Sequence, residues 1–385
     1  MLQPLQSNAM KAQVSNSTSV PAPIRGLNAK DSVADMGEDW ALELENFFPN
    51  LTSVDLRSGY ASHSTGNNST NVETLVEYSG PVTHKLISAA GGSIYDASAV
   101  GSATSIASGK SNNKWQTTMF GTGAGNYLYM VNGEDAPIHY NGSAFATPTL
   151  SGVTAANIIG VAAHQRRLFF TFVGSLVFGY LPVASIAGTV AEFDLGGLCQ
   201  KGGFLMSIGS WTRDGGSGPD DIFVAITSEG ECILFSGNDP GSASAWSLVG
   251  VFSIGKPIGR RSIEKVGSEL IVVTQNGVIP LSIMLPLFNV PVSSTKSIQY
   301  VINTQTGAWG KFTNQPAYCW SLYNGDLYFG GAGGIVYKAD TGTSDAGGNI
   351  EWRIKPAFNY FGSRGVNKLF SMIRPHFTSN GSPAF

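Results

Sequence analysis

Residues 211–261 read WTRDGGSGPDDIFVAITSEGECILFSGNDPGSASAWSLVGVFSIGKPIGRR. Three apolar runs follow one another in this stretch, at 222–227, 232–235 and 246–252, with only turns between them. The stretch has no apolar period of 3.6 residues and is rich in Gly, Val, Ile and Phe, which suit a pleated sheet. It therefore predicts one antiparallel sheet, with Phe223, Ala225, Ile233 and Phe235 on its packing faces.

The same pattern of apolar strand, tight turn and apolar strand recurs along the chain. Asn132-Gly133 separates runs 127–131 and 138–140, Asn276-Gly277 separates 270–274 and 278–281, and Asn324-Gly325 separates 317–323 and 327–330. Asn-Gly is a strong hairpin signal because both residues tolerate positive φ. Repetition of one hairpin unit over this length favours an all-β fold, a β-propeller-like assembly of short antiparallel sheets, over a single barrel.

Four segments are expected. Residues 1–20 are polar and predict a flexible N-terminal arm. Residues 21–60 predict an extended segment with a short helix in 34–48, ADMGEDWALELENFF, which the following proline would stop. Residues 61–340 form the propeller-like body, and residues 341–385 a further β-rich segment, which we expect to be incomplete.

The composition is unusual for its low charge. The 385 residues are 42% hydrophobic and only 13% charged, with 48 glycines and a net charge of -3. Such a surface is either partly hidden in an oligomer or covered by Ser, Thr and Asn, and the composition leaves both open. A dedicated nucleic-acid binder would be basic, so the charge argues against one, although not against a passage that nucleic acid traverses.

The sequence indicates a reduced place of synthesis and no export signal. Cys199, Cys232 and Cys319 are far apart, without the spacing of a zinc site or a disulfide framework. The N-terminus has no apolar core of signal-peptide length, and no later run is long and apolar enough to span a bilayer. We therefore expect synthesis in the cytoplasm and no membrane-spanning segment.

No motif predicts a metal, a cofactor or a catalytic group. The histidines show no metal-ligand spacing and are expected to be hydrogen-bonded structural residues: His63, His84, His139, His164 and His376. The run 214–221, DGGSGPDD, lacks the spacing of an EF-hand loop and predicts an Asp/Gly turn between strands. The run 121–125, GTGAG, lacks the lysine and helix of a phosphate-binding loop and predicts a turn before the next strand.

Two pairs of carboxylates keep a hydrolase open as an alternative. Glu229 with Glu231, or Glu192 with Asp194, are alternate residues that a strand would point to one side, as a glycosidase acid pair requires. Glu229-Gly230-Glu231 falls on a predicted turn, however, where acidic side chains are expected to be solvated.

Two arginine pairs, Arg166-Arg167 and Arg260-Arg261, stand at the ends of predicted strands. They could neutralise nearby carbonyl or carboxylate oxygens, or they could contact another subunit or DNA.

The chain resembles the tail nozzle proteins of short-tailed bacteriophages, also known as tail tubular or stabilisation proteins. The resemblance covers most of residues 21–282 and rests on blocks that occur in the same order: PIRGLN (23–28), LENFFP (44–49), VDLRSG (54–59), YMVNG (129–133) with Ala136-Pro137, HQRRLF (164–169), WTRDG (211–215), DD (220–221) with ITSEGE (226–231), WSLVG (246–250) and IGKPIG (254–259).

The resemblance implies a structural virion protein without catalysis: a propeller-containing subunit, six to a ring, that forms the distal tail channel through which double-stranded DNA is retained and ejected. It also implies contacts with the tail adaptor ring and with tail fibres or spikes. The alternatives are a propeller that recognises carbohydrate and a propeller glycoside hydrolase.

Overall fold

The computed structural model describes residues 17–214, 219–275, 277–281, 288–291, 297–303, 305–362, 365, 367–376 and 378. The regular elements in this part of the chain are strands, apart from two single 3-10 turns, η1 (Ala155–Asn157) and η2 (Ala332–Gly334). The predicted all-β class is confirmed.

Four of the sheets are built from strands that follow one another in the chain. The first blade is β5 (Thr74–Ser79), β6 (His84–Ala90), β7 (Ser93–Asp96) and β9 (Thr104–Ala107); the second is β10 (Gln116–Thr122), β11 (Gly125–Val131), β12 (Ile138–Tyr140) and β13 (Phe145–Ala146); the third is β15 (Ile158–His164), β16 (Arg167–Phe172), β17 (Val177–Tyr180) and β19 (Ala191–Asp194); the fourth is β20 (Leu205–Asp214), β21 (Pro219–Thr227), β22 (Glu231–Gly237) and β23 (Trp246–Ser253).

The fifth blade is likewise built from consecutive strands, whereas the sixth and seventh combine strands from distant parts of the chain. The fifth blade is β24 (Ile263–Val266), β25 (Glu269–Thr274) and β26 (Gly277–Pro280); the sixth is β27 (Phe288–Pro291), β28 (Ser297–Ile302), β29 (Trp309–Phe312), β1 (Ala41–Glu45) and β33 (Arg353–Pro356); the seventh is β30 (Cys319–Tyr323), β31 (Asp326–Gly330), β32 (Val336–Lys338), β4 (Ala61–Thr65) and β8 (Gly101–Ser102). Two small two-stranded sheets are β2 (Phe47–Pro49) with β3 (Val54–Leu56), and β14 (Leu150–Ser151) with β18 (Gly188–Thr189).

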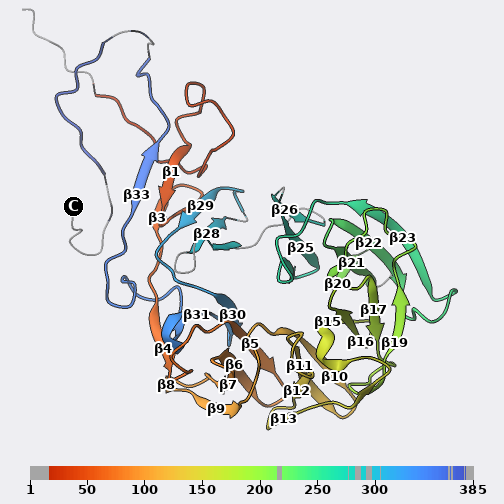
Figure 1. Ribbon diagram of the computed structural model, residues 1–385. Coiled ribbons are helices and arrows are strands. Elements are labelled where there is room, and N and C mark those ends of the chain that lie inside the picture. The colour runs from red at the N-terminus through yellow and green to blue at the C-terminus, as the bar shows by residue number, and fades with distance from the viewer. Residues whose placement is uncertain are drawn as a thin grey trace, which may run out of the picture.

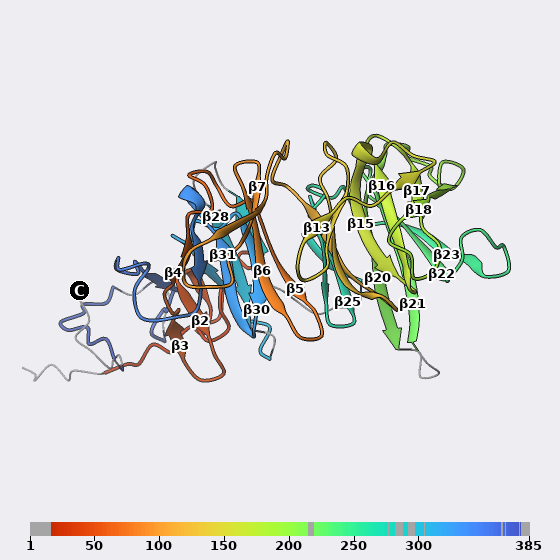
Figure 2. The ribbon, with the colours of Figure 1, turned by 90° about the horizontal axis from the view of Figure 1, so that it is seen from below.

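The blades stand around one axis (Figures 1 and 2). In six of the blades the first strands line the inside of the ring: β30 contacts β5, β5 contacts β10, β10 contacts β15, β15 contacts β20 and β20 contacts β24. The chain is therefore a β-propeller, as the repeated hairpins predicted, and the structure shows that it has seven blades. Strand β4 closes the ring by joining β32 antiparallel at the outside of the seventh blade.

The core lies between successive blades. In the fourth blade, Phe223 and Ala225 of β21 pack toward the third blade, whereas Val224 and Ile226 pack toward the fifth. Both faces of this strand are buried, as a sheet enclosed by two neighbours requires. The sheet predicted from 211–252 is confirmed, with the predicted packing residues in the cluster between the third and fourth blades.

The Asn324-Gly325 turn lies where the sequence predicted it. Asn324 and Gly325 have φ of 50° and 83° between β30 and β31. The GTGAG run joins β10 to β11, and the Asp/Gly run 214–221 joins β20 to β21, although Gly215, Gly216 and Gly218 lie outside the described residues, as do Asn276 and residues 1–16.

The predicted helix in 34–48 is wrong, because residues 41–45 form strand β1 and 47–49 form strand β2. Strand β1 pairs antiparallel with β33 and parallel with β29. Its acidic residues find their cations on those strands: Glu43 approaches Arg353 and Lys355 at 3.3 and 3.6 Å, and Glu45 pairs with Lys311. Long-range pairing thus outweighs the local helix propensity.

Both terminal segments are fastened to the propeller by one buried arginine. Arg57 forms a bidentate ion pair with Asp345, with nitrogen to oxygen distances of 2.6 and 2.8 Å. It also donates to Asn46 Oδ1 and to the carbonyl of Thr313, and Asn46 in turn accepts the Thr313 N–H. The predicted segments 21–60 and 341–385 therefore each supply a strand to the sixth blade and share this anchor.

Candidate functional site: a bulge across the propeller axis

An insertion in the path of the innermost strand of the fifth blade defines the candidate site. Pro257 pairs with Thr274, and Ile263 pairs with Val272. The six residue steps from Pro257 to Ile263 thus lie opposite only two steps from Thr274 to Val272, so this segment contains four extra residues. The Ile258 N–H bonds to the carbonyl of Val273, and the Val273 N–H bonds to the carbonyl of Ser262, so the bulge is fixed at both ends.

Arg261 extends from this bulge to the opposite blades. Its guanidinium donates to the carbonyl of Glu73 at 2.6 Å, to Thr74 Oγ1 at 2.7 Å and to the carbonyl of Trp115 at 2.9 Å. Glu73 and Thr74 stand at the start of the first blade, and Trp115 just before the second. In a ring of seven the fifth blade is three places from each, so these hydrogen bonds take the Arg261 side chain across the ring, at the end where the inner strands begin.

The Thr74 hydroxyl organises the receiving side. It donates to the carbonyl of Asn113 at 2.5 Å and accepts the N–H of Trp115 at 3.0 Å. Its oxygen and two neighbouring carbonyls thus present three acceptors to one guanidinium, a geometry that the planar fork of an arginine fits better than the point charge of a lysine.

The pKa shifts indicate that Arg261 is surrounded by protein but accessible to solvent. Desolvation lowers the pKa of Arg261, although its side chain remains exposed to solvent. Glu264 of β24 is likewise exposed, and desolvation raises the pKa of its carboxyl. Burial also raises the pKa of the Cys319 thiol to about 12, even though the charge of Arg261 opposes the shift. Groups that are surrounded by protein yet reached by water lie at the mouth of a ring rather than in a closed core.

Arg260 stays exposed beside this crossing. Its carbonyl accepts the Ser207 hydroxyl of the fourth blade at 3.0 Å. Its guanidinium lies close to Gly133 in the second blade, so that a Cβ on Gly133 would stand 3.4 Å from Arg260 Nη1. The two adjacent arginines thus span several blades at one end of the axis.

For Arg261 and Arg167, the structure supports the first interpretation of the arginine pairs, in which each guanidinium bonds to carbonyl, hydroxyl or carboxylate oxygens that lie nearby in the fold. Arg167 donates to the carbonyl of Leu181 at 3.3 Å, lies 3.3 Å from Asp239 and stacks over Tyr180. Arg166 is exposed in the tight turn between β15 and β16, with φ of 62°. The sequence marked both pairs, but nothing local indicated that Arg261 would bond to residues 146 to 188 positions away.

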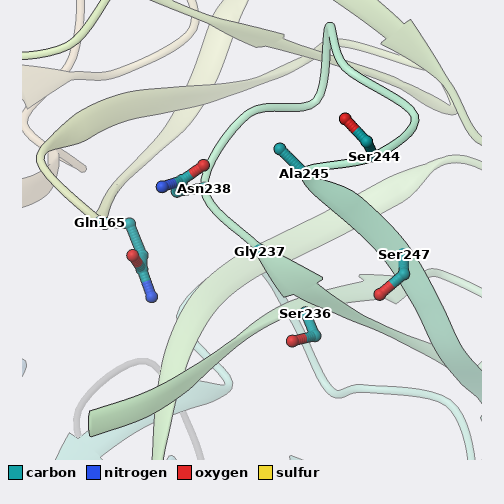
Figure 3. A pocket seen from close by; sticks show the side chains of 7 residues that line it. All are labelled: Gln165, Ser236, Gly237, Asn238, Ser244, Ala245 and Ser247. Atoms are coloured by element: carbon teal, nitrogen blue, oxygen red, sulfur yellow. The ribbon is translucent and has the colours of Figure 1, made fainter. Parts of the chain in front are cut away.

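A polar pocket of about 380 Å³ lies between the third and fourth blades (Figure 3). Gln165 comes from the turn after β15, and the other lining residues come from β22, β23 and the loop that joins them: Ser236, Gly237, Asn238, Ser244, Ala245 and Ser247. Amide and hydroxyl groups can bind polar molecules, but this lining has no carboxylate, imidazole or thiol for acid-base or nucleophilic work.

A second pocket, of about 270 Å³, lies where the N-terminal and C-terminal segments meet. Asp35 and Glu38 line it together with Phe358, Tyr360 and Phe361. It was not foreseen, because its acidic and aromatic residues are more than 300 positions apart in the sequence.

The carboxylate pairs proposed from the sequence lie apart from both pockets. Glu231 is buried, which contradicts the predicted solvated turn, and accepts the N–H groups of Gln200 and Lys201 at 2.9 and 3.0 Å. Glu229 pairs with Lys256 at 2.6 Å. Glu192 and Asp194 are exposed on the outer strand β19.

The buried histidine nearest the first pocket is structural, as predicted. His164 bonds through Nδ1 to the Ser210 hydroxyl at 2.8 Å and through Nε2 to the carbonyl of Gly237 at 3.1 Å. Because a carbonyl can only accept, Nε2 carries the proton. Desolvation lowers the pKa of His164, so the ring is neutral at pH 7.

The other histidines lie in different places. His63 is buried edge-on to Tyr328, His84 faces Glu77 at 3.2 Å, His139 lies between Tyr127 and Tyr129, and His376 is in the exposed C-terminal segment. Within the described ranges, the structure holds no group of three His, Cys, Asp or Glu residues suited to a metal ion. In the same residues, no helix is long and apolar enough to cross a membrane.

The sequence matches no known family model and no curated protein. Among solved structures it is similar to Raptor of Chaetomium thermophilum (14% identity, TM-score 0.45, 74% of this chain and 29% of that one). It is also similar to the extracellular domain of the hybrid two component system BT4673 from B. thetaiotaomicron (11%, 0.45, 74% and 40%) and to BBS1N in complex with ARL6DN (13%, 0.38, 55% and 64%). The chain spans less than two thirds of each of these chains, and likenesses this distant carry no argument about its activity.

Proposed function

We propose that this chain is a structural subunit of the tail of a short-tailed bacteriophage, a nozzle subunit that forms, with five other copies, the distal channel for DNA retention and ejection. The observation that supports the proposal is the ordered set of sequence blocks that resemble those of such proteins. Residues of these blocks lie at contacts between distant parts of the fold: Asn46 and Arg57 form the buried anchor of the terminal segments, and His164 is buried between the third and fourth blades.

The crossing by Arg261 bears on where DNA would pass. A side chain that joins opposite blades obstructs the middle of the single propeller. A DNA path therefore belongs between copies of the chain, in the ring that the proposal requires. The loops at the rim of a rigid propeller can vary and move without disturbing its sheets, and they are the parts proposed to gate that path.

The test is a virus that lacks this protein. Its particles should lose packaged DNA or fail to complete a tail, and imaging of wild-type particles should place copies of this chain in a ring at the end of the tail. Particles that retain their genome and infect normally without the protein would refute the proposal.

The second pocket favours one alternative, recognition of carbohydrate. Aromatic rings beside carboxylates suit the apolar faces and hydroxyls of a sugar, and both line this pocket. Glycan-array binding that is lost in Tyr360→Ala but retained in Tyr318→Ala would support this alternative. Absence of glycan binding by the wild-type chain would exclude it.

A further inference from the structure

One blade presents an unusual outer edge. Strand β23 ends the fourth blade and, among the described residues, has no further strand beside it. It is eight residues long, whereas the outermost strands of the other blades, β9, β13, β19, β26, β33 and β8, have two to four residues. Short edge strands are a common protection against pairing with another chain, and this blade lacks it.

The edge is also apolar on both faces. Leu248 and Val251 extend the face that Phe235 and Ile233 bury, and Phe252 extends the opposite face beside Cys232. Phe252 is 52% exposed and Leu248 45%. The strand, WSLVGVFS, has no charge or proline, and its single register shift near Val249 leaves 250–253 in regular pairing. These are the features of a strand that accepts another strand.

The same chain carries a segment that fits this edge. Residues 367–376, NKLFSMIRPH, form no helix or strand. Leu369 and Ile373 are 91% and 84% exposed, and Phe370 and Met372 are also exposed. In an extended conformation Leu369 and Ile373 would face one side, and Phe370 and Met372 the other. The segment would therefore be apolar on both faces, like β23.

A second copy must supply the segment. In both views, residues 367–376 lie at one side of the molecule and β23 at the other (Figures 1 and 2). The fold already adds outer strands from distant segments, since β33 joins β1 and β4 joins β32.

We propose that residues 367–376 of one copy add a strand to β23 of the next copy. The contact joins two different surfaces, so it repeats head to tail and closes into a ring when the rotation between copies allows it. The inference extends the proposed function, because it names the contact that would join neighbouring copies in the tail ring. It rests on that proposal only for the number of copies.

The experiment is sedimentation velocity on the full chain over a range of concentrations. The arm variant, Met372→Asp with Ile373→Asp, and the edge variant, Leu248→Lys with Phe252→Lys, should each weaken self-association by roughly tenfold or more. The control, Val82→Asp with Val100→Asp, changes valines that are 91% and 79% exposed elsewhere and should associate like the wild type.

Mixing the two variants gives the decisive result. The arm variant retains a working edge and the edge variant a working arm, so an equimolar mixture should form a heterodimer and stop there. An arm variant that assembles like the wild type would overturn the inference while leaving the proposed ring intact. A wild-type chain that stays monomeric at all concentrations would overturn the inference and count against the ring as well.

Discussion

Replacement of Phe223 by alanine tests the core between the third and fourth blades. The side chain is fully buried, and its ring centroid lies 4.7 Å from that of Phe169, 5.1 Å from Phe178, 5.4 Å from Trp246 and 5.6 Å from His164. Neighbours on two blades hold these rings, so the site can collapse little after truncation. We expect Phe223→Ala to lower the free energy of unfolding by about 3–5 kcal/mol.

Urea unfolding followed by tryptophan fluorescence measures this loss, because Trp246 belongs to the same cluster and reports on it directly. Phe358→Ala is the matched control. Its ring is 58% exposed, so its removal should change the free energy of unfolding by no more than about 0.5 kcal/mol. A loss below about 1 kcal/mol for Phe223→Ala would refute the packing described here.

Three further predictions concern the bulge, a turn and a histidine. Arg261→Met removes three hydrogen bonds and should lower the free energy of unfolding by about 1–3 kcal/mol in urea titrations. Gly333→Ala and Gly334→Ala both place an alanine at φ near +67°, but only at Gly334 would the new Cβ clash with the Asn68 carbonyl. Thermal melts should therefore show that Gly334→Ala is less stable than Gly333→Ala by about 1–3 kcal/mol. Because the pKa of His164 is lowered in the folded chain, the imidazole is protonated in the unfolded chain before the folded one as the pH falls below about 6.5. The free energy of unfolding should therefore decline below that pH, and should decline less in His164→Asn. Urea midpoints measured from pH 8 to pH 5 test this.

The blades were predictable because their information is local. An Asn-Gly pair needs only its own backbone preference to reverse the chain, and the continuous apolar run 222–227 needs only a neighbour on each face. Phe223 and Phe235 were therefore assigned to the packing faces before any topology was known. Sheets that cannot bury their faces alone must pack on one another, which favours a propeller, but the number of blades did not follow from the local pattern because the sixth and seventh blades use distant strands.

The parts that escaped prediction depend on partners far along the chain. Residues 41–45 look helical until β33 and β29 supply hydrogen bonds and cations for Glu43 and Glu45. Glu231 looks solvated until two N–H groups from the preceding loop enclose it. Neither partner leaves a trace in the local sequence, and the same holds for the three acceptors of Arg261.

The contacts of the arginines are consistent with the low charge of the chain and with the proposed role in DNA passage. Each phosphate that a protein neutralises adds affinity through counterion release, so a surface rich in available cations would hold DNA rather than let it pass. Arg57 is buried in an ion pair with Asp345, and Arg167 pairs with Asp239 and donates to the carbonyl of Leu181. Arg261 donates hydrogen bonds to three oxygen atoms of its own fold. These three guanidiniums stabilise the propeller and have few donors left for phosphates. Of the two arginine pairs, Arg166 and Arg260 remain exposed, whereas Arg167 and Arg261 hold the blades together, so a channel built from this chain would attract DNA only weakly.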